Sequence, residues 1–472
     1  MGRAEEVLAA LERLRAEDVP THGGRTLAYV YDSGIAEADE LGRRALAMFG
    51  ASNGLDPTAF PSLRRMEADL VADARRLFHG TPDMVGTATS GGTESILLAV
   101  KTARDAAGVD DPVIVVPTTI HAAFHKACAY FGVERVAVPV DPATFRADPA
   151  AMASAMDAHA GRVVLTAVSA PSYAHGVIDP VVEVAAAARE RGVRCHVDAC
   201  VGGWVLPWAD VGQPWAFDAD GVTSLSADLH KYAYTPKGVS LLLHATPELR
   251  RAQFFASADW PGYTMLNSTV QSTKSGGPLA AAWAVTRYFG DEGYARLVRT
   301  VLDGTAAVVR CVEEIEHLRV VAPPDSTLVA VAADEVCDVF TICDLMGERG
   351  WFVQPQMAFA GAPATLHVSL SAATAASVPE FLTALAESVE EAVRRGPIEV
   401  DAGLREAAAS LDPATLDDAA FDLLLDMAGL DSGGEEGLEA PERMGPVNAL
   451  LDVAPSRLRE ALLAAFLDRL TR

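Results

Sequence analysis

Residues 113–140 read VIVVPTTIHAAFHKACAYFGVERVAVPV, and this stretch decides the fold class. Two apolar, β-branched runs, VIVVP and RVAVPV, flank a segment long enough to form a helix. Further strand-like runs follow at 162–170, 194–200, 221–228 and 238–244. The alternation predicts an α/β fold, with a mostly parallel sheet covered by helices on both faces and a ligand at the carboxyl ends of its strands.

The pattern changes after about residue 290, where long helical segments mix with the short runs TLVAVAA and TLHVSLS. This mixture predicts a smaller α+β unit. We therefore expect four parts: a helical arm with a substrate loop (1–60), a large ligand-binding domain (61–289), a small α+β domain (290–396) and a helical C-terminal extension (397–472).

Composition excludes several classes of partner. The 472 residues include 38 Lys and Arg against 64 Asp and Glu, a net charge of −26 that opposes binding to nucleic acid or anionic lipid. The six cysteines form neither a CxxC pair nor a metal-ligand spacing, so we expect reduced thiols and no metal site. The charged N-terminal helix lacks the apolar core of a signal peptide, and no apolar run reaches about 18 residues. These features predict a cytoplasmic protein without a membrane span.

Three strand ends carry groups suited to chemistry. Ser90–Thr93 reads SGGT before a helix, which forms either an anion site or an ordinary capped turn. Asp198 ends a buried strand and needs a partner, either a protonated ring nitrogen or a structural cation. Lys231 ends another strand, and a desolvated lysine can form a Schiff base. An anion cradle, a buried acid and a lysine are the parts needed to hold pyridoxal phosphate (PLP).

A family resemblance rests on these motifs together. TSGGTESILLA (89–99), HVDAC (196–200) and SADLHKYAYTPKG (226–238) resemble the PLP-dependent group II decarboxylases, specifically their sphingosine-1-phosphate lyase branch. The segments FPSLRRMEADLV (60–71) and ERMGPVNALL (442–451) extend the likeness over nearly the full chain. The resemblance implies PLP fold type I and a lyase that breaks a carbon–carbon bond by decarboxylation or by retro-aldol cleavage.

The resemblance also implies roles for individual residues. Lys231 would form the Schiff base, Asp198 would pair with the pyridine nitrogen, and His121 would stack on the ring. Cys200 would pack against the opposite face of the ring. The residues implied in binding the cofactor phosphate are Ser90, Gly91, Gly92, Thr93, Ser226 and His230.

A second set of residues would come from a partner subunit. The segment STKSGG (272–277), with Thr273 and Lys274, matches one that reaches the neighbouring cofactor phosphate in this family's dimers. Lys274 replaces the family's usual arginine, and a lysine still pairs with phosphate as a point charge. The resemblance therefore implies a homodimer with shared active sites.

The residues expected near the substrate leave alternatives open. They are Tyr31, Asn53, Asp56, Tyr173, His175 and Lys237. Tyr173 and His175 would transfer protons or simply pack at a strand end. Lys237 would be a second cation that holds a substrate phosphate, as in the lyase branch, or a surface lysine in a turn.

Asp56 marks a departure from the family, because SNGLDP (52–57) places it where a phosphate-contacting histidine is usual. A carboxylate there would repel a phosphate. We therefore expect Asp56 to face a hydroxyl or ammonium group or to pair with Lys237, unless it only caps a turn before Pro57.

The departure at Asp56 favours a small polar amine or amino acid as substrate. The first alternative is a genuine bacterial sphingosine-1-phosphate lyase. The second is a non-catalytic PLP-binding relative, which would be expected to lack one of Lys231, Asp198 and His121, yet all three are present.

Overall fold

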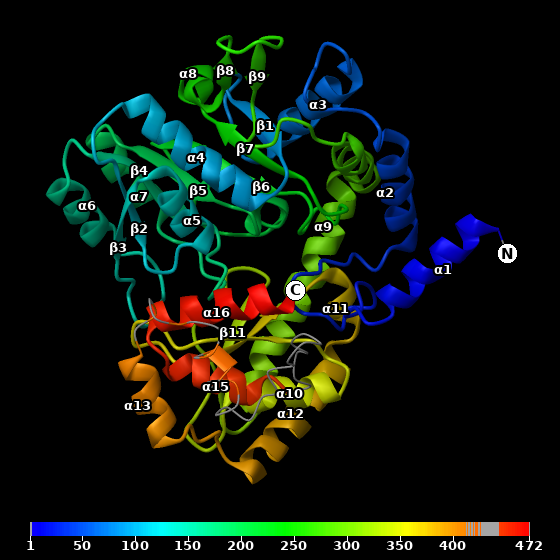
Figure 1. The fold of residues 1–472 in the computed structure, drawn as a ribbon, viewed down its shortest axis with the longest axis vertical. Coiled ribbons are helices and arrows are strands. Elements are labelled where there is room, and N and C mark those ends of the chain that lie inside the picture. The colour runs from blue at the N-terminus through cyan, green and yellow to red at the C-terminus, as the bar shows by residue number, and fades with distance from the viewer. Residues whose placement is uncertain are drawn as a thin grey trace.

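A computed structural model describes residues 2–411, 413, 416, 419, 421–422, 425 and 443–471. Its main feature is a seven-stranded sheet in the order β1-β7-β6-β5-β4-β2-β3 (Figure 1). These strands are β1 (Val85–Thr89), β2 (Val113–Pro117), β3 (Glu134–Val138), β4 (Val163–Ser169), β5 (Arg194–Asp198), β6 (Val222–Asp228) and β7 (Ser240–His244).

The sheet is parallel except at one strand. β7 runs antiparallel to both of its neighbours, β1 and β6, so β1 points the same way as β6 and the other strands. Each run expected from the sequence forms a strand whose ends lie within two residues of the expected ones. The predicted α/β class with a mostly parallel sheet is confirmed.

Helices cover both faces of this sheet, as its strongly apolar strands require. One face packs against α4 (Gly92–Ala107) and α5 (Ala122–Phe131). The helices on the other face are α3 (Pro61–Leu77), α6 (Pro149–Ala158) and α7 (Val181–Glu190), and α9 (Gly277–Glu314) packs against α3. Short elements follow several strands: η1 (Gly202–Trp204), η2 (Leu206–Trp208), α8 (Pro247–Arg250), η3 (Arg251–Gln253) and the β8–β9 pair (Phe255–Ser257, Met265–Asn267).

A second, antiparallel sheet follows in the order β10-β11-β13-β12. Its strands are β10 (Leu318–Val320), β11 (Leu328–Ala333), β12 (Gln354–Gln356) and β13 (Thr365–Ser369), packed with α10 (Val339–Glu348), α11 (Ala372–Ala376) and α12 (Val378–Arg395). α9 connects the two units and is kinked at Gly290, where φ is 56°. The expected boundary between 289 and 290 falls at this kink, and the division into four domains stays a prediction.

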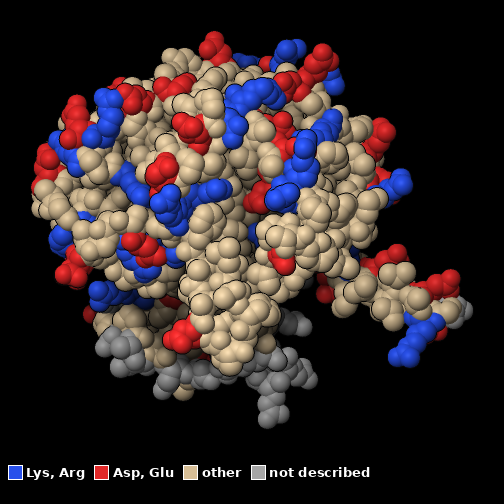
Figure 2. Space-filling model, turned by 90° about the horizontal axis from the view of Figure 1, so that it is seen from above, with Lys and Arg blue, Asp and Glu red and all other residues tan. Residues whose placement is uncertain are grey.

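The two ends of the chain add helices outside these sheets. α1 (Arg3–Arg15) stands away from the body in Figures 1 and 2, whereas α2 (Ala36–Phe49) packs along α9. The C-terminal helices are α13 (Ala402–Ser410), α15 (Gly445–Val453) and α16 (Ser456–Leu470). Across the described residues, no helix combines the length and the apolar character needed to cross a bilayer.

Candidate active site

A cavity of about 420 Å³ opens at the carboxyl edge of the large sheet. Because parallel strands end at the same edge, the loops after β1, β2, β4, β5 and β6 all contribute to its wall. The side chains and loops in this wall include Ser90–Glu94, His121, Tyr173, Asp198, Cys200, Asp228, His230 and Lys231. The structure thus brings together residues that lie far apart in the sequence.

The turn before α4 is suited to binding an anion. A Cβ atom on Gly92 would lie 2.7 Å from the Cys200 sulfur and 2.9 Å from both Asp228 carboxylate oxygens, so only glycine fits there. The backbone N–H groups of the first turn of α4 have no partners within the helix and attract negative charge. This tight glycine turn, with Asp198 and Lys231 in the same cavity, fits PLP.

Glu94 links this turn to the segment 270–271, a role that the sequence did not predict. One carboxylate oxygen accepts a hydrogen bond from the Ser90 N–H at 2.6 Å. The other accepts from the N–H groups of Val270 at 2.9 Å and Gln271 at 3.3 Å. The only signal in the sequence was an acid in the first turn of the helix, which is common in many helices.

Lys231 meets an acid in the cavity. Its Nζ atom lies 3.0 Å from an Asp228 carboxylate oxygen, and Asp228 is almost fully buried. Burial disfavours the charge on Lys231, but the negative charge of Asp228 and further groups outweighs burial and raises the lysine pKa well above its usual value. Asp228 therefore holds the amine in its protonated form.

His121 has a fixed orientation at the start of α5. Its Nδ1 atom accepts a hydrogen bond from the Ala123 N–H at 3.1 Å, so the neutral ring carries its proton on Nε2. Burial lowers the pKa of His121, which keeps the ring neutral. Its ring lies edge-on to Tyr173, with 6.2 Å between ring centroids.

Asp198 and Cys200 both line the cavity, but Ser226 lies beneath it. One Asp198 oxygen accepts hydrogen bonds from the Cys200 N–H at 3.1 Å and the Ser226 hydroxyl at 3.4 Å. Ser226 is fully buried and bonds to His196 at 3.1 Å. This placement corrects the expected phosphate contact, because the hydroxyl points at other protein groups.

Lys237 lies beside this cavity. Its Nζ atom donates to the carbonyls of Tyr29 at 2.8 Å and His230 at 3.3 Å, and it sits 4.9 Å from the centroid of the Tyr31 ring. Burial, followed by the charge of Lys231, lowers the pKa of Lys237 to about 8. Lys237 is therefore a cation at neutral pH that loses its charge in mildly alkaline solution.

Asp56 lies outside this cavity, on a turn. One of its carboxylate oxygens accepts from the Thr58 N–H at 2.8 Å, the Thr58 hydroxyl at 2.6 Å and the Ala59 N–H at 3.2 Å. Among the described residues, no ion pair joins Asp56 to Lys237. The expected pairing with Lys237 is therefore wrong, and the alternative of a turn cap accounts for the contacts of Asp56.

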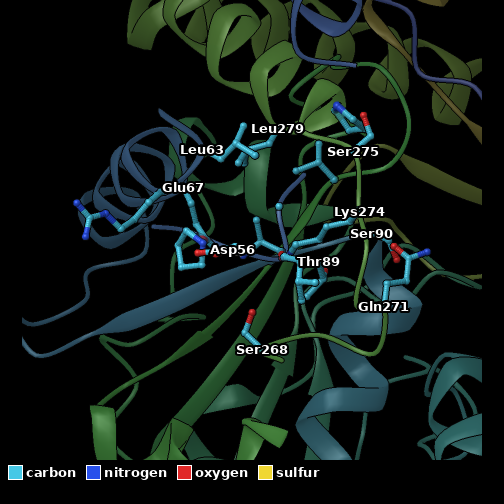
Figure 3. A pocket seen from close by; sticks show the side chains of 18 of the residues that line it. Asp56, Leu63, Glu67, Thr89, Ser90, Ser268, Gln271, Lys274, Ser275 and Leu279 are labelled. Carbon is cyan, nitrogen blue, oxygen red and sulfur yellow. Dashed lines mark hydrogen bonds between the residues drawn. The ribbon is translucent and has the colours of Figure 1, made fainter. Parts of the chain in front are cut away.

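Asp56 and Lys274 line a neighbouring pocket of about 470 Å³ (Figure 3). Figure 3 shows Lys274 beside Thr89 and Ser90, and its Nζ atom donates to the Ala88 carbonyl at 3.3 Å. Thr273 next to it is exposed. The Asn53 side chain accepts from the Leu55 N–H at 3.0 Å, so it also shapes this loop.

His175 also lies apart from the cavity with Lys231. Its ring stacks on Phe145 with 4.2 Å between centroids and lines a separate cavity of about 680 Å³. Burial lowers the pKa of His175 to about 4, so the ring is neutral at pH 7. A direct proton transfer by His175 at Lys231 is therefore not compatible with its position, whereas Tyr173 remains in the cavity wall.

Comparison with known families places the chain among PLP-dependent proteins. A model for the pyridoxal-dependent decarboxylase conserved domain matches residues 44–333. A model described as "Pyridoxal-dependent enzyme, C-terminal putative HTH domain" matches residues 402–469.

Curated relatives give the same result. Sphingosine-1-phosphate lyase of Dictyostelium discoideum is 36% identical over 76% of this chain and 67% of its own length. Sphingosine-1-phosphate lyase 1 of Rattus norvegicus is 37% identical over 73% of this chain, and the match spans 61% of the rat protein.

Solved structures show the same fold. The sphingosine-1-phosphate lyase of Burkholderia pseudomallei superposes with a TM-score of 0.77 and 32% identity, over 84% of this chain and 92% of its own. Glutamate decarboxylase of Lactobacillus brevis shares the fold at a TM-score of 0.74 and 17% identity, over 85% and 95% of the two chains. The chain belongs to the pyridoxal-dependent decarboxylase family, resembles its sphingosine-1-phosphate lyase branch, and is a lyase whose cofactor is PLP.

Proposed function

We propose that this lyase cleaves the carbon–carbon bond of a phosphorylated 2-amino alcohol by a retro-aldol reaction, with a phosphorylated sphingoid base as the substrate class. The observation that carries the proposal is the cation of Lys237, whose exposed side chain lies beside the Lys231 cavity and whose ammonium would meet a substrate phosphate. The names of the relatives agree with this substrate class. Because Asp56 caps a turn, its carboxylate no longer argues against a phosphorylated substrate.

The cofactor, when bound, supplies an electron sink for the pair left by the bond that breaks at the substrate's amine-bearing carbon. Lys231 would hold the cofactor covalently, and Asp198 would pair with its ring nitrogen. His121 would stack on the ring, since its Ala123 hydrogen bond fixes the imidazole at the cavity wall. The Gly91–Thr93 turn and His230 would bind the phosphate.

Two side chains that keep their protons at neutral pH would orient the substrate. Burial raises the pKa of Tyr173 to about 12, so its hydroxyl is a hydrogen-bond donor at neutral pH. Tyr173 would orient a substrate oxygen. Lys237 would fix the phosphate, so that the bond to be broken takes one orientation relative to the ring.

The test is a product analysis with purified, PLP-loaded protein. We expect a phosphorylated sphingoid base to yield a long-chain aldehyde and phosphoethanolamine, both identified by mass. Release of carbon dioxide from amino acids, with no cleavage of the phosphorylated base, would overturn the retro-aldol proposal and favour a decarboxylase. Bound PLP without turnover of either class would favour the non-catalytic alternative.

A further inference from the structure

A chain of polar side chains lies buried beneath Asp198. β5 and β6 are paired so that His196 faces Ser224 and Asp198 faces Ser226. The Nδ1 atom of His196 lies 2.8 Å from the Ser224 hydroxyl, and its Nε2 atom lies 3.1 Å from the Ser226 hydroxyl. The Ser226 hydroxyl in turn reaches an Asp198 oxygen at 3.4 Å. We call Ser224, His196 and Ser226 the polar chain.

The direction of each hydrogen bond follows from Asp198, the acceptor at the end of the polar chain. An ionised Asp198 only accepts, so the Ser226 hydroxyl must donate its hydrogen to Asp198. Ser226 is then left to accept, so His196 must donate from Nε2. The Nδ1 atom of His196 then has no hydrogen and accepts from Ser224. Every hydrogen in the polar chain points toward the Asp198 carboxylate.

Burial explains why this order is stable. His196 and Ser226 are inaccessible to solvent, and 5% of the Ser224 surface is exposed. Burial lowers the pKa of His196 to about 4, so the ring stays neutral and keeps a single proton. The ring of Phe124 packs at 5.9 Å from that of His196, and it offers no competing acceptor. A neutral, dry histidine can hold one orientation.

We infer that His196 and Ser226 are positioning residues, which aim the Asp198 carboxylate at the cofactor's ring nitrogen. Neither residue lines the cavity, so each acts through Asp198. A donor directed at one carboxylate oxygen fixes the orientation of the group, and oriented chains of hydrogen bonds reinforce one another. The inference depends on the cofactor and not on the substrate proposed above.

The experiment compares two ligands on the same protein. PLP and an analogue whose ring nitrogen is replaced by C–H are titrated into cofactor-free protein, and each Kd is measured. We expect Ser226→Ala to weaken PLP binding about fivefold, a modest effect because the 3.4 Å hydrogen bond is long. Binding of the analogue should not change, since it has no nitrogen for Asp198 to meet.

Further variants grade the effect along the polar chain. His196→Leu should weaken PLP binding at least as much as Ser226→Ala, and Ser224→Ala should weaken it less. Thr166→Val is the matched control, because Thr166 is fully buried on β4 and donates to the Val115 carbonyl outside the polar chain. If His196→Leu fails to fold, Ser226→Ala decides the question alone. Equal losses for both ligands, or no loss for either, would overturn the inference.

Discussion

The amine of Lys231 is paired with Asp228 in the cavity, and this pairing should slow the capture of the cofactor. A lysine must lose its proton to attack the cofactor's aldehyde, and Asp228 at 3.0 Å stabilises the protonated form. We expect Asp228→Asn to lower the pKa of Lys231, so that PLP capture becomes half-maximal at a lower pH. The measurement is the rate of PLP uptake by absorbance across a pH series.

Asp210→Asn is the control for this experiment, since Asp210 is exposed and the substitution removes the same charge outside the cavity. Its pH profile should match that of the unmodified protein. An unchanged midpoint in Asp228→Asn would show that Asp228 does not set the state of the amine.

Lys237 should give the enzyme a second pH dependence, in substrate binding. Because its pKa lies at about 8, its ammonium is present below that pH and is lost as the pH rises through it. We expect KM for a phosphorylated substrate to rise above about pH 8 while kcat changes little. Lys237→Met should raise KM roughly two- to fivefold at pH 7, because the side chain is exposed and solvent screens its attraction for the phosphate.

Lys237→Arg tests the same point with the charge retained, because a guanidinium stays protonated throughout this range. Its KM should no longer rise near pH 8. A KM that is insensitive to Lys237→Met would move the phosphate site elsewhere.

The elements of the large sheet were predictable, and so were most of the residues at their ends. Short apolar, β-branched runs indicated β2 to β7, and parallel strands bring their carboxyl ends to one edge, which put Lys231, Asp198 and His121 together. The position of Ser226 could not be predicted in this way, because it depends on the register of β5 and β6, which shifts between Cys195 and His196 and places Ser226 opposite Asp198.

Loop conformations could not be predicted in this way. Asp56 lies in a turn whose local hydrogen bonds compete with any long-range partner, and no periodicity reports that outcome. His175 follows Tyr173 by two residues but stacks on Phe145 from another loop. Such contacts depend on tertiary packing between segments, which the strand pattern does not specify.

The loop between β4 and α7 is held by one buried acid. Asp179 accepts hydrogen bonds from the N–H groups of Ala147 and Ser169, each at 2.9 Å. We expect Asp179→Ala to destabilise the protein by about 2–4 kcal/mol, because two buried donors lose their acceptor. Thermal unfolding measures this loss, and a melting temperature unchanged within a degree would contradict it.

The ionisation of Asp179 also predicts how the stability of the protein depends on pH. Burial raises the pKa of Asp179 to about 6 in the folded protein, above its usual value. Its protonated form therefore stabilises the folded state at low pH, and that contribution is lost as the pH rises through about 6. Asp179→Asn, which cannot ionise, should reduce the change in melting temperature between about pH 4 and 7.

At the scale of the whole molecule, α1 presents an apolar face that stays exposed among the residues that the structure describes. Val7, Leu8, Leu11 and Leu14 are 55%, 60%, 56% and 68% exposed, and their spacing places them on one side of the helix. The segment 272–277 next to the candidate active site also carries exposed residues, including Thr273. Both features suit the homodimer with shared active sites that the sequence predicts.

We therefore expect a dimer in solution that depends on α1. Replacing Leu8, Leu11 and Leu14 by Gln should shift the protein toward monomer, because association loses the burial of these side chains. Sedimentation analysis over a range of concentrations measures the shift. The matched control replaces Glu12 and Arg13 by Gln, which changes the polar side of the same helix with no change in net charge, and it should remain dimeric.

The affinity for PLP then distinguishes an active site that two subunits build together from one that each subunit completes alone. If Lys274 of one subunit supports the cofactor phosphate of the other, the α1 variant should bind PLP more weakly at low protein concentration and recover affinity as dimers form. Lys274→Ala should weaken PLP binding in the dimer without changing its assembly. A monomeric variant that binds PLP as tightly as the native protein at every concentration would show that each subunit completes its own site.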